Sequence, residues 1–268
     1  MLRLLKIEWN KIYGYKTARI FIILYFVLLA SMGFLATIIK PSVGGVSLNL
    51  AQLGAYIFPY VWQTISYFAD FGSIFLAIII ITNITNEYSY RTIKQNLIDG
   101  FTKKEFLLSK LLVSLIFAAL STVLVFAACI GLGLYYTQNP VSIFTGIEFI
   151  LGYFLKLSVF FSLCTFLAFT IRKSGFAFML IILWRLGENI ALGIEKLNST
   201  SAFHISNLLP GNAAAQLLPF PKIHPENFIS GKTVFDLDKF HAEYCTVVVI
   251  YIVLFVFLSY RLLKKKDL

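Results

Sequence analysis

The sequence predicts an all-α integral membrane protein with six transmembrane helices, an interfacial helix before them, a short cytoplasmic helix and re-entrant or interfacial helices before the last span. Three observations predict this class: 59% of the 268 residues are hydrophobic, only 13% are charged, and the mean hydropathy is +0.81. This composition excludes a water-soluble globule. Helices are favoured over barrel strands because the apolar runs are continuous and a helix satisfies its own backbone in lipid.

Six apolar runs are long enough to cross a hydrocarbon core of about 30 Å, which needs roughly 20 helical residues. The predicted spans are 20–39, 58–85, 107–136, 147–171, 174–194 and 243–263. Residues 1–19 then form a cytoplasmic interfacial helix, and residues 20–268 form the six-span domain. The first run is too long for a signal-peptide core, so we expect it to be retained.

The basic residues set the predicted orientation. Of the 23 Lys and Arg residues, 16 fall on one side of the six spans and five on the other. Because cytoplasmic loops collect Lys and Arg, both termini are predicted to be cytoplasmic. A nucleic-acid partner is not expected, because the basic residues do not gather on one solvated face.

The N-terminal segment has the pattern of a helix lying in the membrane interface. Its apolar residues at helical spacing are Leu2, Leu5, Trp9, Ile12 and Tyr13, and those turned elsewhere are Lys6, Glu8, Asn10 and Lys11. Two roles are open for this helix, a simple membrane anchor or a docking surface for a partner.

Residues 86–100 are predicted to form a short amphipathic helix between the second and third spans. Tyr90, Ile93, Leu97 and Ile98 lie on one stripe, and Glu87, Arg91, Lys94 and Gln95 lie largely off it. Asp99 and Gly100 end this helix, because glycine accepts the left-handed conformation at a helix C-terminus. Thr102 and Glu105 have the spacing of a capping box that starts the next helix.

The outer segment, residues 195–242, contains four of the seven prolines and cannot be one helix. Its apolar part, Ala202 to Phe220, is broken by Pro210 and Gly211 and suits re-entrant or interfacial helices. Asp238 and His241 could face one metal ion if the region were helical, but a surface polar cluster is favoured. No catalytic motif is recognised, so no catalytic residue, metal or cofactor is assigned to this chain.

Four charged residues inside the predicted spans, Asp70, Lys156, Arg185 and Glu188, are the candidates for function. Scales based on membrane insertion, which give the lower published costs, assign about 2.5–3.5 kcal/mol to such a charge at a helix centre. Arg185 and Glu188 are three residues apart and can pair on one helix face. One interpretation is a structural network in which Asp70 neutralises Lys156 or Arg185. The other is that these charges, with Tyr67, line a translocation path.

The arrangement of spans and the segment from residue 87 to 110 resemble the permease subunits of type-2 (export) ABC transporters. The motif of that family is matched by an acidic residue, Thr, Leu, Gly and two basic residues, here Glu87, Thr92, Leu97, Gly100, Lys103 and Lys110. The resemblance implies that residues 86–100 are a coupling helix docked in an ABC-type ATPase subunit. The coupling residues are then Glu87, Tyr90, Arg91, Thr92, Lys94, Leu97, Gly100 and Lys103.

The resemblance also implies the partners and the energy source. ATP and Mg would be bound by the separate ATPase, and this chain would pair with a second permease copy or a related permease in a bacterial plasma membrane. The expected function is outward movement of a hydrophobic or amphipathic substrate, without enzymatic activity in this chain. Two alternatives remain open: an integral-membrane lipid-modifying enzyme, and an ion-coupled secondary carrier.

Overall fold

The computed structural model is mostly helical, and the residues that it describes are 2–38, 42–43, 46–47, 54–90, 92–93, 95, 100, 102–138, 143–198, 205–224 and 235–265. Four helices are individually long and apolar enough to cross a membrane, and the number rises to six if each of two bent helix pairs is one span. The chain is therefore a helical membrane protein with four to six candidate spans, and the sequence predicts the upper number.

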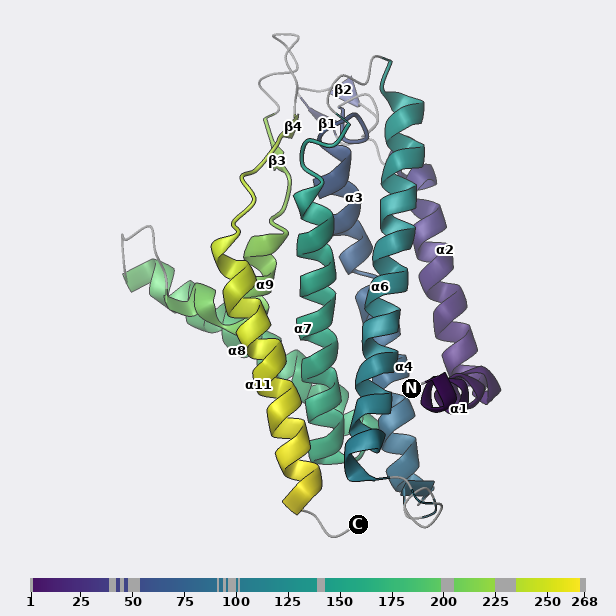
Figure 1. Cartoon of the computed structure of the whole chain (residues 1–268). Coiled ribbons are helices and arrows are strands. Elements are labelled where there is room, and N and C mark those ends of the chain that lie inside the picture. The colour runs from purple at the N-terminus through teal and green to yellow at the C-terminus, as the bar shows by residue number, and fades with distance from the viewer. Residues whose placement is uncertain are drawn as a thin grey trace.

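The first bent pair consists of α1 (Leu2–Gly14) and α2 (Lys16–Ile38), which meet at 89°. α1 therefore lies across the direction of α2 instead of extending it (Figure 1). The helix expected from residue 20 begins at Lys16. Within the expected apolar stripe, Ile12 is buried and Trp9 and Tyr13 are exposed, whereas Glu8, expected off the stripe, is buried.

The second bent pair occupies the predicted span 58–85, which is not one straight helix. α3 (Val61–Asp70) and α4 (Ser73–Ser89) are bent by 41° at a two-residue break. At this break the amide of Gly72 donates to the carbonyl of Ala69 (2.9 Å), three residues back instead of four. A Cβ on Gly72 would lie 2.9 Å from the ring of Tyr25, so glycine lets α2 approach closely here.

The remaining long helices are α6 (Lys103–Tyr136), α7 (Glu148–Ile171), α8 (Ser174–Asn198) and α11 (Glu243–Lys265). Each covers one predicted span and differs from it by at most four residues at either end. Arg172 ends α7 in the left-handed conformation (φ 60°), so α8 starts after a two-residue turn. α8 leaves the bundle obliquely (Figure 1), and most of its large apolar side chains are exposed.

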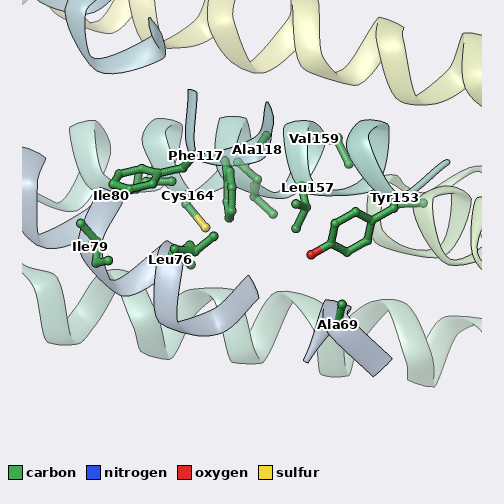
Figure 2. Close-up of a cluster of buried hydrophobic side chains, with 14 of the residues drawn as sticks. Ala69, Leu76, Ile79, Ile80, Phe117, Ala118, Tyr153, Leu157, Val159 and Cys164 are labelled. Atoms are coloured by element: carbon green, nitrogen blue, oxygen red, sulfur yellow. The ribbon is translucent and has the colours of Figure 1, made fainter. Parts of the chain in front are cut away.

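α7 lies at the centre of the bundle and packs against α4, α6 and α11. Figure 2 shows Leu76 of α4, Phe117 of α6 and Leu157 of α7 in one apolar cluster. A buried chain of hydroxyl groups crosses the bundle beside it. Ser121 hydrogen-bonds to Tyr25 and, at 2.8 Å, to Tyr153, and thereby links α2, α6 and α7.

The outer segment forms a 3-10 helix η1 (Ile205–Leu208), a short helix α9 (Pro210–Leu217) and the strands β3 (Lys222–Ile223) and β4 (Phe235–Asp236), which pair. β1 (Ser42–Val43) and β2 (Val46–Ser47) form a second small hairpin. Pro210 interrupts the segment as expected, but it does so as the first residue of α9, where its missing N–H is harmless. Residues 237–241 are not helical, so the geometry required for a metal between Asp238 and His241 does not form.

The two ends of the bundle are formed by different elements. The strands lie at one end, whereas the C-terminal ends of α4, α7 and α11 lie at the other (Figure 1). α1 lies in the same half as those C-terminal ends.

Candidate functional site

A buried ionic cluster joins α1, α4 and α6 at the end of the bundle opposite the strands. Its centre is Lys110, whose side chain is only 1% exposed. The ammonium lies 2.7 Å from Oε2 of Glu8 and in direct contact with Oε1 of Glu87. We call Glu8, Glu87 and Lys110 the ionic cluster.

Three neighbours of this cluster also bond to its carboxylates. Lys11 Nζ lies 2.9 Å from Glu87 Oε1 and 3.7 Å from Glu8 Oε1. The amide of Asn83 donates to Glu8 Oε2 (3.0 Å), and the hydroxyl of Ser109 donates to Glu8 Oε1 (3.4 Å). A buried charge is tolerated only where it is paired and hydrogen-bonded, and this cluster meets both conditions.

The charged form of Glu8 is favoured although the residue is buried. Burial alone would raise the pKa of its carboxyl, but attraction and hydrogen bonding from Lys110, supported by Lys11 and Asn83, lower the pKa below its usual value. Glu8 therefore holds α1 against the bundle as a carboxylate.

The sequence interpretation missed Glu8, because it placed this residue off the apolar stripe of the N-terminal helix. One signal was present: Glu8 is the only acidic residue before Asp70, and it lies at helical spacing between Leu5 and Ile12. Glu87 and Lys110 were singled out because of the family resemblance. The structure brings these two residues together, 23 positions apart in the sequence.

The segment expected to be a coupling helix over 86–100 is only partly described. Its first residues are the last turn of α4, which ends at Ser89. Tyr90, expected on the apolar stripe with Ile93, is 68% exposed, whereas Ile93 is buried. Thr92 is half-buried, and its hydroxyl donates to the backbone carbonyl of Glu87 at 3.5 Å. Arg91, Lys94 and Leu97 lie outside the described residues.

The turn into α6 has the predicted construction. Gly100 adopts φ 91°, the left-handed region that favours glycine. The Thr102 side chain accepts from the amide of Glu105, and the Glu105 carboxylate accepts from the amide of Thr102 at 2.9 Å. The predicted capping box is thus confirmed, and Lys103 is the first residue of α6.

A second group of charges lies inside the bundle, where α3 breaks into α4. Asp70 ends α3, and its Oδ2 lies 2.9 Å from Nζ of Lys156 on α7. The same ammonium lies 5.8 Å from the ring centre of Tyr67, a cation–π distance. The structure therefore pairs Asp70 with Lys156.

Arg185 and Glu188 pair on α8, where Nη1 of Arg185 lies 2.9 Å from Oε2 of Glu188. Glu188 also accepts from Nε1 of Trp184 (2.7 Å) and from the amide of Gly211 (3.1 Å). That amide is one of the unsatisfied donors at the start of α9, so Glu188 anchors α9 to α8. A Cβ on Gly211 would lie 1.9 Å from Nη1 of Arg185, so a larger residue here would displace the ends of the Arg185 and Glu188 side chains.

Both charge pairs border one cavity of about 490 Å³. Asp70, Lys156 and Arg185 line it, whereas Tyr67 and Glu188 lie just behind the lining. Apolar side chains form most of the remaining wall. Within the described part of the chain, no group of three His, Cys, Asp or Glu side chains is placed to hold a metal ion.

Comparison with known families gives a match over most of the chain. A family model described as "Protein of unknown function (DUF2705)" matches residues 34–268. A comparison with curated proteins gave no significant match.

Proposed function

The chain belongs to the family of proteins of unknown function DUF2705, and we propose that it is the permease subunit of an ATP-driven exporter of the ABC type-2 class. In this proposal a separate ATPase subunit binds ATP and Mg and docks on the end of the bundle that carries the ionic cluster, in the cytoplasm. Two such permeases, identical or related, complete the transporter in a bacterial plasma membrane.

The observation that carries the proposal is that one helix, α4, links the two charged sites. Its first residues, Ser73 and Ile74, line the cavity, and Glu87 in its last turn belongs to the ionic cluster. The 14-residue separation corresponds to about 21 Å of helix. A displacement at the cytoplasmic end is therefore delivered to the break beside Asp70.

The ionic cluster couples α1, α4 and α6, so a displacement of one of these helices would move the other two. Lys110 fixes α6 to α4 through Glu87 and to α1 through Glu8. The capping box at Thr102 starts α6 two residues after the turn at Gly100, which fixes the beginning of this span. An ATPase pressing on this end would move α1, α4 and α6 as one body, the kind of rigid-body motion that opens a path.

The docking surface in this proposal includes Tyr90, an exposed aromatic side chain beside the turn, and the exposed face of α1. Close to Tyr90 in the sequence, Arg91, Lys94 and Lys103 supply cations for an acidic groove on the partner. The absence of a nucleotide-binding motif in the sequence agrees with an energy source on another subunit.

The test is purification of the full chain from its native membrane in mild detergent, with partners identified by mass spectrometry. We expect a protein with ATPase motifs, and we expect Tyr90→Ala to reduce its recovery at least fivefold. Tyr135→Ala is the matched control, because Tyr135 is an exposed aromatic residue at the opposite end of α6. Equal recovery with both variants contradicts docking at this surface.

A second measurement separates the proposal from the carrier alternative. The chain alone in sealed vesicles is expected to move no substrate in response to an ion gradient. Transport by the chain alone would instead favour an ion-coupled carrier using Asp70 and Lys156.

A further inference from the structure

The cavity between the α3–α4 break, α7, α8 and α9 has the features of a ligand site. Its volume of about 490 Å³ is within the usual range for small-molecule pockets. Its walls are mainly apolar, with a few charged groups from separate helices. Such a combination binds a molecule that has a compact polar group and an apolar body.

Arg185 is the cation available to a ligand. Its acidic neighbour Glu188 is already engaged by Trp184 and by the first turn of α9. A guanidinium has five N–H donors, and within the described residues Arg185 uses one, through Nη1 to Glu188. Its side chain is 39% exposed and lines the cavity. These donors suit a phosphate or carboxylate group, which Arg binds in a bidentate manner.

Asp70 is the anion available to the same ligand. Its side chain is 27% exposed, and Lys156 contacts it through only one oxygen, Oδ2. The remaining oxygen can accept from a ligand cation that has N–H groups. The four charged side chains of the two pairs sum to zero, so the site favours a zwitterion over a net anion.

The apolar wall continues onto the outer surface of the bundle. Phe71, Ile74, Ile182 and Leu186 line the cavity and are each at least half exposed. In a membrane-spanning bundle such exposed apolar side chains face lipid chains. A ligand can therefore keep its hydrocarbon in the bilayer while its polar group enters the cavity.

We propose that this cavity binds a phospholipid with a zwitterionic amine headgroup, with the phosphate on Arg185 and the primary ammonium on Asp70. The inference rests on the proposed function and names its substrate class. Arg185 lies 11 residues from the start of α8, about 17 Å along the helix, and the cavity that it lines adjoins the α3–α4 break inside the predicted span 58–85. A headgroup held at this depth is away from its resting position at the bilayer surface, as expected of a lipid in transit.

The test uses the full-length chain in nanodiscs that contain equal amounts of phosphatidylethanolamine and phosphatidylglycerol, with retained lipid counted by native mass spectrometry. We expect phosphatidylethanolamine to be retained at least fivefold over phosphatidylglycerol. Arg185→Gln should reduce the total amount of retained lipid at least fivefold, because it removes the phosphate contact that both lipids share. Asp70→Asn should abolish the preference, because it removes the contact to the ammonium. Lys196→Gln, which removes the same charge as Arg185→Gln from the exposed end of the same helix, should leave both the amount and the preference unchanged.

A second pair of variants, which fill space instead of removing charge, tests the inference if Arg185→Gln does not fold. Ile182 lines the cavity and is 57% exposed, whereas the adjacent Leu183 is 50% exposed and does not line it. Ile182→Trp should reduce retained phosphatidylethanolamine at least fivefold, and Leu183→Trp should not. Equal retention by this pair, preferential retention of phosphatidylglycerol, or retention of a peptide instead of a lipid overturns the inference. Recovery of the ATPase from the same preparations reports separately on the proposed function.

Discussion

Lys110 is buried between two carboxylates, so removing one of them leaves a charge incompletely paired. Breaking a buried ion pair by deleting one partner costs about 3–5 kcal/mol. We expect Glu8→Gln to lower the free energy of unfolding by an amount of this order, because Glu8 is the contact between Lys110 and α1. The measurement is thermal unfolding of the purified chain in detergent.

The matched control for that experiment is Lys6→Gln, an exposed position on the same helix. A surface change of this kind alters stability by no more than about 0.5 kcal/mol. If the two variants unfold at the same temperature, the ionic cluster does not hold α1.

The lowered pKa of Glu8 gives a separate prediction about acid. A carboxyl whose pKa is lower in the folded state stabilises the fold above its unfolded pKa, and this contribution is lost as the pH falls through the folded pKa. The wild-type melting temperature should therefore fall as the pH drops below about 4.5, the unfolded value. The melting temperature of Glu8→Gln should fall less over the same pH interval. Identical acid sensitivity of the two proteins would show that Glu8 is not the titrating group.

The start of α6 depends on the side chain of Thr102, which accepts a hydrogen bond from the amide of Glu105. In return, the amide of Thr102 donates to the Glu105 carboxylate. Thr102→Ala should cost about 1 kcal/mol. The loss should appear as faster hydrogen exchange in the first turn of α6. Thr170→Ala is the control, since Thr170 is exposed within α7 and bonds only to the carbonyl of Phe166. Faster exchange throughout α6 in both variants would contradict a local capping role.

The helices differ in how far the sequence could predict them. α6, α7, α8 and α11 follow from continuous apolar runs, because lipid imposes a length and a composition on any spanning helix. The bend at Gly72 depends on the close approach of Tyr25 from α2, a contact that no local pattern contains. The strands are two residues long and show no periodicity.

The two sites also differ in this respect. Charge in an apolar run identified Asp70, Lys156, Arg185 and Glu188 from the sequence, but their grouping around one cavity required the packing of α7 and α8. The pairing of Glu8 was out of reach for a similar reason. Its partner Lys110 is 102 residues away, and the spacing of Glu8 with Leu5 and Ile12 does not indicate which helix it meets.

The arrangement of the whole bundle makes a prediction about its orientation. α1 and the C-terminal end of α11 lie in one half, and β3, which begins at Lys222, lies at the other end (Figure 1). We expect Lys6→Cys and Lys264→Cys to react with a membrane-impermeant maleimide only after the cells are opened. Lys222→Cys should react in intact cells, because the Lys222 side chain is 63% exposed at the outer end.

Native thiols interfere little with this labelling, since Cys129 and Cys164 are buried and Cys245 can be replaced by Ser. Reaction of Lys6→Cys in intact cells would place the ionic cluster and Tyr90 outside the cell, where no ATPase can dock. A reaction of Lys264→Cys on the opposite side from Lys6→Cys would mean an odd number of crossings. In that case one bent pair, α1–α2 or α3–α4, enters and leaves the membrane on the same side. The labelling pattern therefore separates an odd number of crossings from an even number such as six, and tests the docking proposal with the same three proteins.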